Sequence, residues 1–218
     1  MFQYDMLARS IAAGKGYRWY QRADVEVLRP YLQQLYGVSL PIDQIPVDGL
    51  VTTFRAPGYP AFLAVVYIVG GLPGRFAAAR LVQTALSALL APLTALLAAR
   101  LGAVRRASLI AGALVALHPI LWMYPLGLAS ENLFIPLVVL SLLALLSAAA
   151  ARRGSFSVLS GVMLGLATLT RGALAPFVAL AGIFLLPRLG RALALGLWMG
   201  YLVYGLLFPF QITTHDYY

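Results

Sequence analysis

Residues Leu133–Ala151, LFIPLVVLSLLALLSAAAA, contain no charged side chain. Phe76–Ala99 and Ala107–Ala129 are also long and predominantly apolar. A helix that crosses a bilayer needs about 20 such residues. These three segments are therefore predicted to be transmembrane helices.

Three further apolar segments are shorter or broken, and each is bounded by basic residues, glycine or proline. Two of them contain glycines four residues apart, Gly161/Gly165 and Gly196/Gly200, a spacing that lets membrane helices pack closely. Together with the long segments they predict an all-α integral membrane protein with a bundle of about six transmembrane helices. The three shorter segments are Ser155–Thr170, Ala173–Leu186 and Ala192–Phe210.

The composition agrees with a membrane protein. Hydrophobic residues make up 61% of the 218 residues, against about 45–50% in a soluble domain. The net charge of +9 does not indicate a nucleic-acid partner, because the basic residues lie mostly in short loops between apolar segments. The sequence has no cysteine, no Cys/His metal cluster and no glycine-rich nucleotide-binding motif.

The basic loops also predict an orientation. Three of them are separated from one another by two predicted spans each, so they lie on the same side, which the positive-inside rule makes cytoplasmic. Glu131, Arg171 and both chain ends then lie on the external side. The arginines of these loops are Arg100, Arg105, Arg106, Arg152, Arg153, Arg188 and Arg191.

Residues 1–75 form the more polar, external part, and 76–218 form the bundle. A first helix is predicted to end at Gly14, with Tyr4, Leu7 and Ile11 on one face. Asp5 and Arg9 fall on the opposite face, which we expect to point toward water.

A second helix follows over Val25–Leu35, with Asp24 as N-cap, Gly37 as its end and a kink or break at Pro30. Val38–Val51 is predicted to be extended. The apolar run Ala61–Val69 is too short to span, so we expect a helix along the membrane surface.

The acids outside the spans are candidate catalytic groups. Asp5 is either a catalytic carboxylate or half of a surface ion pair with Arg9. Glu131 is a rare acid at a membrane helix end, which is usually functional, although the helix dipole also stabilises an exposed Glu there.

Three arginines are candidates for binding an anion. Arg171 lies between two short helices, where it either binds a phosphate or carboxylate or snorkels to the interface. Arg55 either binds phosphate or holds a turn. Arg80 and Gln83 either line a polar cleft or bond to each other.

Several stretches, in this order, resemble the GT-C membrane glycosyltransferases, in particular bacterial relatives of dolichyl-phosphate-mannose–protein mannosyltransferases and of the aminoarabinose–lipid A transferase. The resemblance covers most of residues 1–187. The stretches are Tyr4-Asp5 to Gly14-Lys15-Gly16-Tyr17, Arg55-Ala56-Pro57-Gly58-Tyr59-Pro60, Leu117-His118-Pro119, Ser130-Glu131-Asn132, and Gly161 to Gly165 to Leu169-Thr170-Arg171.

The resemblance implies a large external loop with a catalytic Asp, matched by Asp5, and a second external acid, matched by Glu131. It implies that Ala61–Val69 is a juxtamembrane helix. We assign Lys15 and Tyr59, which belong to the matching stretches, as further substrate-binding residues. Such enzymes have a transmembrane helix before this Asp and more spans after position 218, so we expect the chain to be a fragment.

The predicted reaction is transfer of a sugar from a polyprenyl-phosphate donor to an acceptor hydroxyl, with inversion, at the periplasmic face of a bacterial inner membrane. The acceptor is a glycan, a lipid or a protein. Asp5 is the predicted general base, and Arg171, with Arg55 or Arg80, neutralises the departing phosphate. Glu131 orients the acceptor or holds a divalent cation, the one cofactor considered.

Two other classes stay open from the sequence. One is a membrane protein without enzymatic activity, such as a transporter or assembly subunit. A transporter more often carries ionisable residues near mid-membrane, whereas here the acids gather at one face. The other is a lipid-linked-glycan polymerase or ligase.

Overall fold

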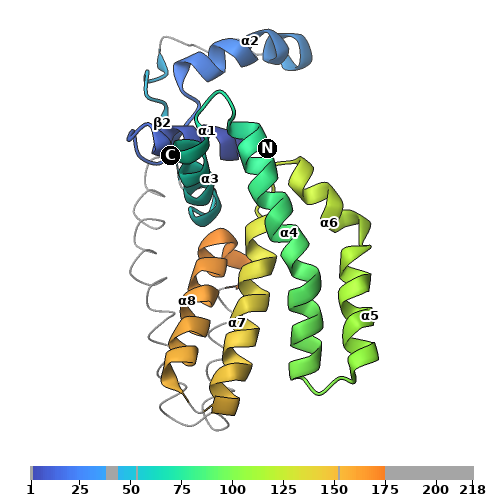
Figure 1. The fold of residues 1–218 in the computed structure, drawn as a ribbon. Helices are drawn as coiled ribbons and strands as arrows, with labels where there is room; N and C mark the ends of the chain where they lie inside the picture. Colours follow the sequence, from blue (N-terminus) through green and yellow to red (C-terminus); the bar gives the residue numbers. More distant parts are fainter. Residues whose placement is uncertain (1, 38–43, 53, 152, 175–218) are drawn as a thin grey trace.

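A computed structural model describes residues 2–37, 44–52, 54–151 and 153–174. The predicted span Ala192–Phe210, the pair Gly196/Gly200 and all but the start of Ala173–Leu186 lie outside these residues. The elements in chain order are α1 (Phe2–Ala12), β1 (Arg18–Trp19), α2 (Arg22–Tyr36), β2 (Leu50–Val51), α3 (Gly58–Gly70), α4 (Arg75–Arg100), α5 (Arg105–Ala116), α6 (Pro119–Met123), the 3-10 turn η2 (Tyr124–Leu126), α7 (Glu131–Ala151), α8 (Gly154–Thr170) and the 3-10 turn η3 (Gly172–Leu174) (Figure 1).

The fold is mostly helical, as predicted, and the long helices α4, α5, α7 and α8 run alongside one another (Figure 1). Among the described residues, α4 and α7 are each long and apolar enough to cross a membrane. The helices α3 and α8 are apolar but shorter. The described residues therefore contain two to three candidate spans, and a bundle of six stays a prediction.

The predicted span Ala107–Ala129 is broken in the structure. α5 ends at Ala116 and the chain bends by 47° before α6 and η2 continue. Pro119 starts the new helix because it has no N–H for a preceding carbonyl, and His118 before it is extended. The indole N–H of Trp122 donates to the Ala116 carbonyl oxygen at 2.6 Å, which satisfies an acceptor at the break.

Small residues bring the long helices together. Gly161 and Gly165 are both buried on α8, in agreement with the predicted close packing. Ser141 of α7 and Ser160 of α8 are buried and bond reciprocally, each hydroxyl to the other residue's carbonyl at 2.9–3.0 Å. Against α4, a Cβ on Gly112 of α5 would lie 2.8 Å from a backbone oxygen, so only glycine fits there.

The N-terminal helix α1 packs on α3. The face predicted to be apolar does face inward: Leu7 is fully buried, and Tyr4 and Ile11 pack against the core that Ala8 forms with α3. The prediction that Asp5 points toward water is wrong, because Asp5 is 3% exposed. Helix periodicity placed it opposite the apolar face, but Tyr67 of α3 and Arg75 at the start of α4 both contact its carboxylate.

The helix α2 begins at Arg22, three residues earlier than predicted, so Asp24 lies in its first turn and is not the N-cap. Pro30 lies inside one continuous helix. Gly37 ends it as predicted, in the left-handed conformation at φ 64°. Of the stretch predicted as extended, the described part contains β2, which pairs antiparallel with β1, so the fold is not strictly all-α.

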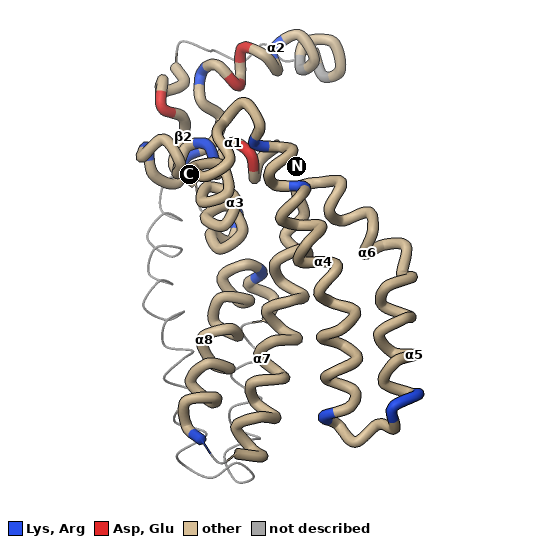
Figure 2. The backbone as a smooth tube through the Cα atoms, in the orientation of Figure 1, with Lys and Arg blue, Asp and Glu red and all other residues tan. Residues whose placement is uncertain are grey.

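The two ends of the bundle differ in charge. Arg100, Arg105 and Arg153 lie at the turns of one end, while the acids of α1 and α2 lie at the other (Figure 2). Glu131 starts α7 and Arg171 follows α8, so both lie at the end that carries the acids, where basic residues are present as well (Figure 2). This matches the predicted separation; Arg188 and Arg191 lie outside the described residues.

Candidate functional site

A cavity of about 840 Å³ opens where α7 begins and α8 ends. Its walls come from α1, from the segment before α3, from the α6–η2 arm and from the segment after α8. Three predicted site residues, Arg55, Glu131 and Arg171, line it. The lining residues are Tyr4, Phe54, Arg55, Ala56, Ile120, Met123, Tyr124, Leu126, Gly127, Leu128, Ala129, Ser130, Glu131, Thr170, Arg171, Gly172 and Ala173.

Glu131 and Arg171 form an ion pair inside this cavity. Arg171 Nη1 lies 2.5 Å from Glu131 Oε1, although 40 residues separate them in sequence. The second carboxylate oxygen accepts from the Ser130 hydroxyl at 3.3 Å. Both side chains are partly exposed, 25% for Glu131 and 44% for Arg171, so both remain accessible to a ligand.

Arg55 presents a second guanidinium to the cavity. Its Nε and Nη2 both donate to Gln3 Oε1, at 2.9 and 2.7 Å. Its carbon Cζ also lies over the rings of Tyr4 and Phe54, 5.3 and 5.2 Å from their centroids. A guanidinium has five N–H donors in a planar fork, so this clamped group retains donors for an anion.

The α6–η2 arm gives the cavity an apolar wall. Ile120, Met123 and Leu126 line the cavity, and each is at least about half exposed. Exposed apolar side chains beside two guanidinium groups fit an amphipathic ligand, with an anionic head and a hydrocarbon tail.

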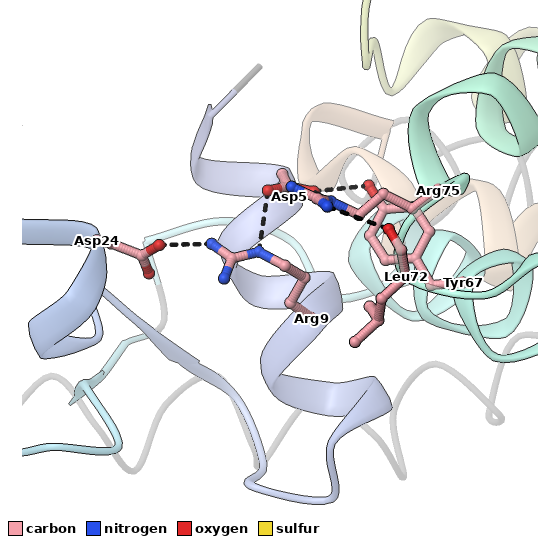
Figure 3. Close-up of polar contacts among 6 residues, drawn as sticks. All are labelled: Asp5, Arg9, Asp24, Tyr67, Leu72 and Arg75. Atoms are coloured by element: carbon pink, nitrogen blue, oxygen red, sulfur yellow. Dashed lines mark hydrogen bonds and ion pairs between the residues drawn. The ribbon is translucent and has the colours of Figure 1, made fainter. Parts of the chain in front are cut away.

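Asp5 does not line this cavity. Its carboxylate accepts from Arg9 Nε at 3.0 Å and, through the other oxygen, from Arg75 Nε at 2.8 Å (Figure 3). Tyr67 of α3 donates its hydroxyl to the same oxygen as Arg75, at 3.1 Å. Burial, with the nearby Asp5 charge, raises the pKa of Tyr67, so its hydroxyl remains a donor. Arg9 also reaches Asp24 of α2 at 2.6 Å.

This arrangement joins α1, α2, α3 and α4 through one buried carboxylate. The predicted ion pair with Arg9 is present, but it is buried and not on the surface. The catalytic assignment of Asp5 stays a prediction, and the residue does not line the cavity. Arg75 and Tyr67 were missed because they lie 70 and 62 residues away in sequence. The position of Arg75 directly before the first long apolar segment is the one signal that marks it.

Three other predicted substrate-binding residues are not among the residues that line the cavity. Tyr59 is fully buried and donates to Gln83 Oε1. Arg80 is exposed and donates to the Leu126 carbonyl at 3.1 Å, so it does not bond to Gln83. Lys15 pairs with Asp48 at 2.8 Å on the surface.

The donor set does not fit a divalent cation. Hard cations take six or more oxygen ligands, usually with several carboxylates. Glu131 is the one acid among the lining residues of the described chain, and Arg171 already bonds it.

Comparison with known proteins identifies the family. Residues 55–213 match the profile of the family described as dolichyl-phosphate-mannose-protein mannosyltransferase. The chain belongs to this family. Membership makes it a membrane-associated glycosyltransferase of the GT-C type. No individual curated protein and no solved structure matches the chain. The profile match includes Arg55, Glu131 and Arg171, and Asp5 lies outside it.

Proposed function

We propose that the protein transfers a sugar from a polyprenyl-phosphate donor to an acceptor hydroxyl on a glycan, lipid or protein, with inversion. The observation that carries this proposal is the Glu131–Arg171 pair, with Arg55 in the same cavity. The family favours a transferase over a transporter or assembly subunit.

In this reaction the acceptor oxygen attacks the anomeric carbon from the face opposite the phosphate. The new C–O bond forms as the bond to the phosphate oxygen breaks, and that oxygen leaves with the electron pair. Arg171 and Arg55 neutralise the charge on the departing phosphate, where preorganised donors act most strongly. The apolar α6–η2 wall accommodates the start of the lipid chain.

The acceptor loses its proton to a carboxylate. We propose Glu131 for this role, because of the two predicted acids it is the one that lines the cavity. Its oxygen Oε1 is bonded to Arg171, while Oε2 accepts from Ser130 at 3.3 Å and is the oxygen that we propose takes the acceptor proton. The assignment of Asp5 as base stays a separate prediction, which the same experiment tests.

The cavity lies where α7 begins and α8 ends. The turn between α4 and α5, with Arg100 and Arg105, lies at the other end of the helices (Figure 2). If this turn is cytoplasmic, the reaction takes place at the periplasmic face of a bacterial inner membrane. Labelling of single introduced cysteines by an impermeant maleimide in intact cells tests this orientation, since the sequence has no cysteine of its own.

The test of the mechanism is a transfer assay in proteoliposomes with a polyprenyl-phosphate sugar. Glu131→Gln should lower kcat by roughly 10²–10⁴-fold, the usual contribution of a general base. Asp48→Asn, a surface acid, is the control. If Glu131→Gln keeps the wild-type kcat while a folded Asp5→Asn loses it, Glu131 is not the base and Asp5 is.

A further inference from the structure

Tyr59, Gln83 and Asn132 form a polar network in an apolar part of the fold. They come from α3, α4 and α7 and are 0, 0 and 2% exposed. Burying a polar group costs free energy unless the group is hydrogen-bonded. The three side chains are therefore expected to bond one another.

A single atom, the side-chain oxygen of Gln83, accepts the hydrogen bonds from the other two residues of the network. Tyr59 Oη and Asn132 Nδ2 both donate to Gln83 Oε1, at 2.5 and 2.8 Å. Burial raises the pKa of Tyr59, which keeps its hydroxyl protonated as the donor. Gln83 Nε2 has no partner among the described residues. Gln83 therefore acts as an acceptor, and its amide nitrogen contributes no bond.

Each end of the network touches a wall of the cavity. Asn132 follows Glu131, and its Nδ2 also lies 2.9 Å from the Tyr124 carbonyl and 3.1 Å from the Ala129 carbonyl. Both of those residues line the cavity. At the other end the Tyr59 ring meets the ring of Tyr4, another lining residue, edge-on at 4.9 Å.

We propose that Tyr59, Gln83 and Asn132 are positioning residues, which hold Glu131 and the η2 wall in the geometry needed for transfer. The inference rests on the proposed function of the cavity. It explains why α7 starts with Glu131 at a fixed place: the next residue is bonded across to α4 and back to the preceding turn. It also gives Tyr59 a role without contact with substrate.

The alternative is a purely structural role, in which the network only holds helices together, as the bonds between Ser141 and Ser160 do farther from the cavity. The two roles differ in a measurable way. A structural bond affects stability alone, whereas a displaced catalytic group affects turnover, and about 1 Å of misplacement costs roughly 10²-fold.

The first test uses matched variants in the proteoliposome assay. Gln83→Met, similar in size, removes both bonds and should lower kcat about 10- to 100-fold, with the donor KM changed less than about twofold. Gln83→Glu keeps an acceptor oxygen for both donors and should retain a higher kcat. Tyr59→Phe, which removes one hydroxyl, should fall between wild type and Gln83→Met. Ser141→Ala, which breaks a buried interhelical bond elsewhere, should keep the wild-type kcat.

Wild-type kcat in folded Gln83→Met and Tyr59→Phe would overturn the proposal, as would equal loss in Gln83→Met and Gln83→Glu. If Gln83→Met does not fold, Tyr59→Phe decides the question alone.

The second test does not depend on activity. A spin label on Met123→Cys, on the cavity wall and 67% exposed, reports the mobility of the turn that Asn132 anchors. Mobility should rise when Gln83→Met or Tyr59→Phe is added and stay unchanged with Ser141→Ala. An unchanged label in both network variants overturns the positioning role. A wild-type chain that transfers no sugar but shows this label response overturns the proposed function alone.

Discussion

Replacing Asp5 with Asn tests what the buried carboxylate does. The substitution keeps the size of the side chain and removes its charge. Arg9 and Arg75 then face a neutral amide in a site where the Asp5 side chain is 5% exposed. The hydroxyl of Tyr67 keeps an acceptor in the amide oxygen, so the loss comes mainly from the two ion pairs.

The magnitude follows from this geometry. Removing one partner of a buried ion pair costs about 3–5 kcal/mol. Arg9 and Arg75 are 23 and 25% exposed, and Arg9 keeps Asp24, so both retain some solvation. We therefore expect the lower end, about 3 kcal/mol, which corresponds to a fall in Tm of roughly 6–12 °C for a chain of this size.

The assay is thermal unfolding in detergent micelles, followed by circular dichroism, for Asp5→Asn, Arg75→Met and the double variant. Because the two groups are in contact, the double variant should lose less than the sum of the single losses, by at least about 1 kcal/mol. Asp48→Asn, an exposed acid, is the control. A Tm for Asp5→Asn equal to that of wild type, or additive losses, would refute the structural role of the network.

Three further predictions concern packing and charge. Gly58→Val should destabilise the fold by about 1–3 kcal/mol, because a Cβ there would lie 2.8 Å from the α8 backbone; Gly154→Val, which has open space, should not lower Tm. Gly112→Val should separate α5 from α4, seen as faster proteolysis of the turn between them, and unchanged cleavage would contradict the packing argument. The hydrogen bond from Lys15 lowers the pKa of Asp48. The small contribution of this ion pair to stability is therefore present at neutral pH and is lost as the pH falls through the folded-state pKa of Asp48. Lys15→Met should raise the pKa of Asp48 in an NMR titration and lower the neutral-pH Tm only slightly.

The sequence was sufficient to predict most of the described helices and their order. Long apolar runs, proline and glycine are local signals, and each acts within one or two helical turns. For this reason the left-handed Gly37 and the ends of α4, α7 and α8 lie within two residues of their predicted positions. The separation of arginine turns from the acids also followed from counting segments.

The break in the predicted span lies at His118–Pro119, between the end of α5 and the start of α6. Proline marks it in the sequence, but a proline inside an apolar helix does not always break it: Pro92 and Pro136 lie inside α4 and α7. At the break after α5, the indole of Trp122 donates to the Ala116 carbonyl.

Of the candidate site, the sequence supplied Arg55, Glu131 and Arg171, and the tertiary structure decided that they share a cavity. The tertiary structure also decided that Asp5 and Tyr59 are buried. Helical periodicity predicts which face of a helix is apolar. The burial of Asp5 on the polar face of α1 depends on Tyr67 and Arg75, which lie 62 and 70 positions away in sequence. Those contacts arise from packing between helices, which a local pattern does not encode.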